Sequence, residues 1–158
     1  MYQGLAGFFL IEDEVSNSLD IPKIYGEDDI PLVIQDRRFF SNGQFAYAQN
    51  MHDILNGVIG NYLLVNGAMQ PRLSVHGGLV RLRLLNGSNS SMYRIGFKDH
   101  RTFQVIASDG GFLEQPVAMN SIVLSAGERA EVVIDLSDVG LGNQISLMVE
   151  QMKGSLFE

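Results

Sequence analysis

One stretch in the middle of the chain constrains the fold more than any other, because its apolar and charged side chains alternate with a period of two. It reads L-V-R-L-R-L-L-N-G-S-N-S-S-M-Y-R-I. Val80, Leu82 and Leu84 are apolar, and they alternate with Arg81 and Arg83. Successive side chains of a strand point to opposite faces, whereas a helix would scatter these five residues around its axis. The pattern therefore predicts a half-buried strand with one apolar and one cationic face.

The alternation resumes after a polar interruption. Residues 86–91 (N-G-S-N-S-S) accept positive φ or bond their own backbone, which is typical of a turn. Tyr93, Ile95 and Phe97 then place apolar side chains on one face again. The predicted arrangement is a half-buried strand, a polar corner and a second strand.

Similar patterns predict further strands on both sides of this stretch. Residues 103–117 combine an apolar strand, an Asp-Gly-Gly turn and an exit that ends near a proline. Residues 129–136 and 144–150 also alternate, and the Asn-Gly step at 66–67 is a strong hairpin signal. Residues 50–61 favour a short helix or a loop instead. Several short strands separated by Gly and Asn turns predict an all-β Greek-key sandwich or barrel.

Charge balance and missing residue types argue against several classes of function. The chain has 158 residues, of which 11 are basic and 18 acidic, whereas phosphate binding needs clustered Lys and Arg; nucleic acid is therefore not expected as a partner. We expect Arg81 and Arg83 to meet carboxylates on the outer face of their strand. The lack of cysteine excludes disulfides and thiolate zinc sites. No apolar run approaches the ~20 residues that span a bilayer.

The sequence contains no recognisable group of metal ligands. A blue-copper site needs two histidines, a cysteine and a weak axial ligand, and coupled copper centres need paired histidines. The chain has no cysteine, and His52, His76 and His100 are far apart in unrelated contexts. The methionines are dispersed, and the close pair Met148 and Met152 is expected in the core and a linker. We therefore assign no metal-binding and no cofactor-binding residue.

No catalytic constellation stands out either. Asp109 and Glu114, at and just after the Asp-Gly-Gly turn, are the natural acid/base candidates. Turn geometry explains that motif better, because glycine supplies positive φ and Asp bonds the amides that follow it. Ser108 and Ser125 have no histidine nearby in the sequence that could activate them. We assign no catalytic residue.

Six phrases of the sequence form one ordered series that covers nearly the whole chain. They are G-L-A-G-F-F-L-I-E-D (4–13), I-P-L-V-I-Q-D-R-R-F (30–39), L-V-N-G (64–67), V-R-L-R-L-L-N-G-S-N (80–89), V-I-A-S-D-G-G (105–111) and A-G-E-R-A-E-V-V-I-D (126–135). In this order they resemble the multicopper oxidases, in particular the bacterial laccase and cuprous-oxidase branch. Each phrase alone is a weak signal, and six in register are a strong one.

The resemblance implies a cupredoxin-like fold and a division of the chain. Residues 1–13 would be the terminal strand of a preceding cupredoxin domain, because the G-L-A-G phrase takes that place in the family. Residues 14–29 would be a linker, and residues 30–150 the copper-free middle cupredoxin-like domain. Residues 151–158 would start a linker to a following domain. The chain would then be a fragment of a longer parent.

The apolar run F-F-L-I near the N-terminus predicts a buried strand over residues 4–11. Separated from its original sheet, such a strand would leave an exposed apolar edge that has to be covered. We expect it to dock on the domain or to pair with another copy in a swapped or symmetric homo-oligomer.

The resemblance implies two alternative functions for the parent. The first is a laccase-like multicopper oxidase, which oxidises phenols or metal ions by one electron and reduces dioxygen to water. Copper would lie in the flanking cupredoxin domains, and this chain would be their scaffold partner, inactive alone. The alternative is a copper-free structural relative that acts in bacterial cell division. A periplasmic or extracytoplasmic location is expected for the parent family, and the choice between an enzyme and a structural protein stays open.

Overall fold

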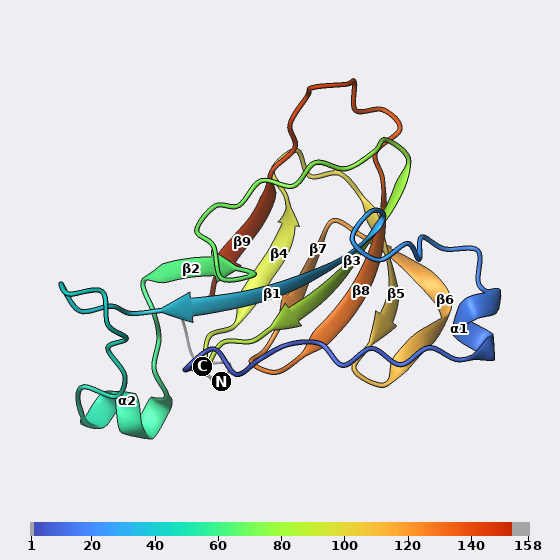
Figure 1. The fold of residues 1–158 in the computed structure, drawn as a ribbon. Coiled ribbons are helices and arrows are strands. Elements are labelled where there is room, and N and C mark those ends of the chain that lie inside the picture. The colour runs from blue at the N-terminus through green and yellow to red at the C-terminus, as the bar shows by residue number, and fades with distance from the viewer. Residues whose placement is uncertain (1, 153–158) are drawn as a thin grey trace.

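Strands dominate the computed structural model, which describes residues 2–152 (Figure 1). The strands are β1 (Asp29–Arg37), β2 (Tyr62–Val65), β3 (Leu79–Asn86), β4 (Tyr93–Phe97), β5 (Phe103–Ser108), β6 (Gly111–Met119), β7 (Ser121–Leu124), β8 (Arg129–Asp135) and β9 (Leu147–Gln151). Two short helices, α1 (Glu14–Ser18) and α2 (Met51–Asn56), lie outside the sheets. None of the helices in this range is long and apolar enough to cross a membrane.

The strands form two sheets that pack face to face. The larger sheet has the order β2-β1-β3-β8-β5-β6, and the smaller has the order β7-β4-β9. β1 and β3 pair in parallel, and the other pairs are antiparallel. Strands that lie side by side in a sheet but are distant in the sequence are typical of Greek-key connections. The prediction of an all-β, cupredoxin-like sandwich is confirmed.

The hydrophobic core fills the space between the two sheets. The apolar face of β3 contributes Val80, Leu82 and Leu84, and β4 contributes Ile95 from the opposite sheet. The other buried members of this cluster are Ile30, Ile34, Tyr93, Phe97, Phe103, Val105, Leu124, Ala130, Val132, Ile134 and Leu136. The period-two alternation of the sequence therefore correctly identified the core face of the central strand.

The opposite face of β3 differs from the expectation of a half-buried strand. Arg81 and Arg83 are only 4% and 7% exposed. Two other parts of the chain cover this face. The segment before β1 passes over the sheet (Figure 1). Residues 5–9 line a cleft beside Leu85. The ring of Phe112, from β6, lies 5.6 Å from the Arg81 guanidinium carbon.

The N-terminal segment is extended but is not the buried strand that the sequence predicted. Within residues 2–13 no strand is formed, and Leu5, Phe9 and Ile11 are exposed. The side chains that alternate with these, of Ala6, Phe8 and Leu10, are half-buried. The segment therefore lies on the domain with one face inward. The prediction of a strand was wrong because an apolar run becomes a strand only where a sheet edge can pair with its backbone.

Residues 14–29, predicted as a linker, have local order in the structure. Asp13 caps α1 by accepting from the Ser16 backbone at 2.7 Å, while Ser16 Oγ accepts from the Asp13 backbone at 2.8 Å. Lys23 Nζ donates to the Leu19 carbonyl at 3.0 Å. The last residue of the predicted linker, Asp29, belongs to β1. Of the predicted second linker at 151–158, Gln151 lies in β9 and residues 153–158 lie outside the described range.

Substitution of Leu84 by alanine tests the position of the core. Leu84 is 1% exposed in the centre of β3, so we expect Leu84→Ala to lower the free energy of unfolding by about 2–5 kcal/mol. Leu79→Ala is the matched control, because Leu79 starts the same strand but is exposed, and we expect a change within about 0.5 kcal/mol. Urea unfolding followed by circular dichroism measures both values. Equal losses in the two variants would contradict the packing described above.

Candidate functional site

The three histidines lie on separate segments of the domain. His52 is in α2, His76 is in the connection between β2 and β3, and His100 is in the turn after β4. All three are exposed. Among residues 2–152, no group of three or more His, Asp or Glu side chains is placed to hold a metal ion.

The other residues singled out from the sequence have structural surroundings. Asp109 accepts from the Arg129 backbone at 2.7 Å and forms a 3.1 Å ion pair with its guanidinium, so it ties the β5–β6 turn to β8. Glu114 lies exposed in β6. Met148, expected in the core, is exposed in β9, because it shares the outward face of that strand with Glu150.

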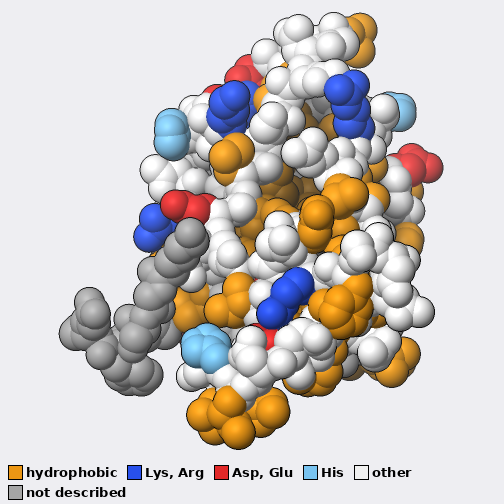
Figure 2. Space-filling view, turned by 90° about the vertical axis from the view of Figure 1, so that its left-hand side faces the viewer, with side chains coloured by type: hydrophobic (Ala, Val, Ile, Leu, Met, Phe, Trp, Pro, Cys, Tyr) orange, Lys and Arg blue, Asp and Glu red, His pale blue; other side chains and the backbone are white. Residues whose placement is uncertain are grey.

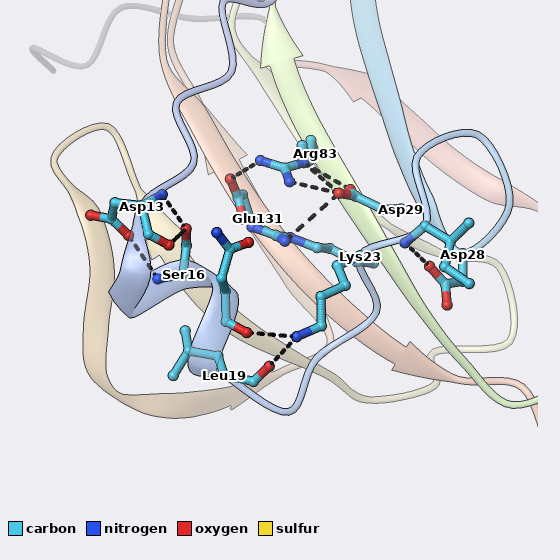
Figure 3. A network of polar contacts seen from close by, with 11 residues as sticks. Asp13, Ser16, Leu19, Lys23, Asp28, Asp29, Arg83 and Glu131 are labelled. Carbon is cyan, nitrogen blue, oxygen red and sulfur yellow. Dashed lines mark hydrogen bonds and ion pairs between the residues drawn. The ribbon is translucent and has the colours of Figure 1, made fainter.

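A buried ionic network joins three neighbouring strands on the outer face of the larger sheet (Figure 3). Arg83 of β3 donates from Nε and Nη2 to Asp29 of β1, at 2.7 and 2.6 Å. Its Nη1 donates to Glu131 of β8 at 3.1 Å. Arg81 donates from Nε to Glu131 at 2.8 Å and lies 3.7 Å from Asp29. Each arginine thus contacts both carboxylates.

Strand register explains why these four side chains meet. Arg83 is the register partner of Glu131 across the β3–β8 pair, and Arg81 is the partner of Asp29 across the β1–β3 pair. Side chains of paired residues point to the same face of a sheet. Hydrogen bonding to Asp29 is the main reason why the pKa of Arg83 is raised above its ordinary value. The expected meeting of the arginines with carboxylates is confirmed.

A second buried polar cluster surrounds Asp36, near the end of β1. Its Oδ2 accepts from the Gly60 backbone and from Ser91 Oγ, both at 2.6 Å. Its backbone N–H donates to Ser88 Oγ, which lies 3.0 Å from the Tyr93 hydroxyl. Burial raises the pKa of Tyr93 to about 12.

The same cluster fixes the polar turn at residues 86–91. Asn86 has no exposed surface, and its Nδ2 donates to the carbonyls of Ser91 at 2.7 Å and Leu124 at 3.0 Å. Gln151 of β9 donates to Ser91 Oγ at 2.9 Å. This turn therefore connects the two sheets through side-chain bonds, and its asparagines have a structural role.

Half of the first network is visible in the sequence, and none of the second is. The alternation of Arg81 and Arg83 was visible, but Asp29 was assigned to a linker. Asp36 follows an apolar run, and a carboxylate at a strand end is usually solvent-exposed. Its burial depends on Gly60, which is distant in sequence and whose own position no local pattern indicates.

The sandwich and its strand order define a cupredoxin-like domain. A family model for multicopper oxidases matches residues 31–143. The chain therefore belongs to the multicopper oxidase family, as its sequence phrases predicted.

Two groups of known proteins are similar to the chain. Cell division protein FtsP of Yersinia pestis is 45% identical over 154 residues, which is 98% of this chain and 31% of that protein. FtsP of Escherichia coli (strain K12) is 45% identical over 147 residues, 93% of this chain and 30% of that protein. The chain thus spans under a third of these relatives' length.

Among solved structures, the laccase-like multicopper oxidase CueO of Ochrobactrum sp. superimposes with a TM-score of 0.80 and 38% identity, covering 87% of this chain and 30% of that one. Laccase of Pediococcus acidilactici superimposes with a TM-score of 0.79 and 38% identity, covering 87% of this chain and 29% of that one.

Copper is implied by the family name, but the donor set of this chain does not fit a family copper site. A blue-copper centre uses a thiolate, and the chain has no cysteine. The three histidines are spread over α2, the β2–β3 connection and the turn after β4. The polar residues that are buried serve to hold strands and turns together.

Removal of one carboxylate tests the ionic network. Asp29→Ala leaves the buried Arg83 without its closest partner, so we expect the free energy of unfolding to fall by about 3–5 kcal/mol. Glu150→Ala is the control, since its ion pair with Arg94 is exposed and should contribute at most about 1 kcal/mol. Chemical unfolding of both variants gives the two values. A loss for Asp29→Ala no larger than for the control would show that the network does not stabilise the sheet.

Substitution of Gly60 tests the close approach of its backbone to β1, where Gly60 donates to Asp36. A Cβ at Gly60 would lie 2.3 Å from the Arg37 backbone nitrogen, and β1 cannot move without losing its sheet partners. We expect Gly60→Ala to cost at least about 2 kcal/mol of unfolding free energy. Gly110→Ala, where a Cβ meets nothing within 4 Å, should stay within about 0.5 kcal/mol of the parent chain. Thermal unfolding of the two variants measures the difference. Equal melting temperatures for Gly60→Ala and Gly110→Ala would refute the close approach of Gly60 to β1.

Proposed function

We propose that this chain is a copper-free scaffold domain of a longer multicopper-oxidase-family protein that acts in bacterial cell division. The observation that carries the proposal is the 45% identity to cell division protein FtsP over 98% of the chain. The laccase-like structures share 38% identity over 87% of the chain, so the similarity to FtsP is both higher and more extensive.

The chemistry of the buried polar groups supports a scaffold role. Arg81, Arg83 and their two carboxylates contact one another, and Asp36 accepts from backbone and side-chain donors of two different loops. Such groups fix the relative positions of strands and loops. A domain built in this way presents a rigid surface to its neighbours.

The division of the chain follows from the same proposal. Residues 30–150 form the scaffold domain, and residues 1–13 come from a preceding cupredoxin domain. Residues 14–29 connect the two, and residues 151–158 lead to a following domain. The exposed apolar side chains of the N-terminal segment support this division, because they would be covered in the longer protein.

A laccase-like oxidase parent is the second candidate. The fold similarity supports it, since the Ochrobactrum structure has a TM-score of 0.80 and its name describes oxidase activity towards lignin model compounds and lignosulfonate. In that case copper and the oxidation of phenols would belong to flanking domains, and the role of this chain as a scaffold would be unchanged.

The two candidates differ in copper content and in cellular position. The complete product of the gene that contains this chain is expressed as a fluorescent fusion in Escherichia coli lacking its own FtsP, and is also purified after growth with copper. We expect the fusion to gather at division septa and the purified protein to hold copper far below one equivalent. The Ochrobactrum laccase-like oxidase, prepared in the same way, is the copper-loaded control. Stoichiometric copper with oxygen uptake on a phenol would overturn the cell-division proposal.

A further inference from the structure

Helix α2 turns one polar residue inward and all of its apolar residues outward. The one buried residue of this helix is Asp53, which is 8% exposed. Met51, Ile54 and Leu55 are 67%, 65% and 74% exposed. At spacings of three and four residues they share one helical face. A surface helix of a globular domain normally has the opposite arrangement, with the apolar stripe toward the core.

Specific bonds hold the helix in this orientation. Asp53 Oδ1 accepts from Arg38 Nη2 at 2.8 Å, and its Oδ2 accepts from the Gln49 backbone at 2.8 Å. Hydrogen bonding from Arg38 is the main cause of the lowered pKa of Asp53. Asn50 caps the helix by accepting from the Asp53 backbone at 2.9 Å. The outward turn of the apolar side is therefore built into the fold.

The end of the helix is also fixed. Gly57 follows it with φ of 81°, and a Cβ there would lie 2.6 Å from Ser90 Cβ. The next residue, Val58, is buried and donates its N–H to Asn89 Oδ1 at 2.9 Å. The helix is thus attached to the domain at both ends and presents a preorganised surface.

The apolar surface extends beyond the helix. We call it the α2 face, and it consists of Phe45, Tyr47, Met51, Ile54, Leu55, Ile59 and Tyr62, all exposed. Between residues 39 and 62 the only charged side chain is Asp53, which is paired with Arg38. Figure 2 views the molecule from the side of α2 and β2, and hydrophobic side chains gather over the lower half of this view. Aromatic residues and Met without charges are typical of the core of a protein interface.

The N-terminal end of the described chain lies beside this face. Tyr2 is buried, its ring centroid is 4.8 Å from that of Tyr47, and its hydroxyl accepts from the Arg38 backbone at 2.8 Å. At the other end, Gln151 bonds to Ser91 in the cluster around Asp36. Polypeptide before Tyr2 would therefore join the domain close to the α2 face.

We propose that the α2 face is the docking surface for a second domain of the same longer polypeptide. This inference rests on the proposed function, in which the chain is one domain of a longer protein. The relatives carry more than two-thirds of their length outside the matched region. Tyr2 places the N-terminal end of the described chain next to the α2 face. The partner surface is apolar and largely uncharged, because the α2 face offers no free charge to a partner.

The test compares the same substitution in two chains. Leu55→Glu and Ile54→Glu are each made in the 158-residue chain and in the complete product of the gene that contains it. In the complete protein a buried charge replaces an apolar contact, so we expect its melting temperature to fall by at least about 4 °C. In the 158-residue chain both positions are exposed, so the shift should stay within about 1 °C. Amide exchange of residues 50–57 should also be slower in the complete protein.

Val123→Glu is the control, because Val123 is exposed in β7, outside the α2 face, and should behave alike in both chains. Equal shifts in the two chains for the α2 variants would overturn the proposal, as would a gene product no longer than this chain. A 158-residue chain that is dimeric by light scattering and dissociates with Leu55→Glu would overturn it in favour of a second copy. Copper content and septal position test the proposed function separately, since neither depends on what covers the α2 face.

Discussion

The two buried arginines of β3 set the condition under which this sheet forms. β3 is covered on both faces, by the core on one side and by the N-terminal segment and Phe112 on the other. A guanidinium in that position is tolerated only with carboxylates in contact, because an unpaired buried charge is very costly. Asp29 and Glu131 supply them from the strands on either side. β2 then extends the sheet from β1, and β5 and β6 extend it from β8.

The sequence predicts the strands well, because alternation along a strand is a local property. The period-two pattern at residues 79–86 places β3, and the Asp-Gly-Gly step places the turn between β5 and β6. The Asn-Gly step at 66–67 has positive φ at both positions and forms a tight turn, which the isolated bridge between Val65 and Ala68 closes. The predicted hairpin is not extended, because β2 pairs with β1 instead. These signals need no knowledge of the partner strand.

Features that depend on distant partners were beyond the reach of local patterns. The apolar run F-F-L-I indicates a strand, but its backbone pairs with no strand among residues 2–152, and it stays an extended segment. The helical spacing around Ile54 indicates a helix without telling which side faces outward, since Arg38 decides that through Asp53. Asp29 and Asp36 are buried for the same kind of reason, as their partners lie 54 and 24 residues away.

The ionic network also has a consequence for the order of events during synthesis on the ribosome. Arg83 is separated by 54 residues from Asp29 and by 48 residues from Glu131. At roughly 5–20 residues per second, β1 emerges several seconds before β3, and β3 several seconds before β8. Until β8 is made, β3 has one edge unpaired and Arg83 has only one of its two carboxylates. The nascent chain thus stays incomplete over a period in which a chaperone could bind it. Glu131 is the last of the four charged residues to be synthesised, and its strand completes the pairing of β3.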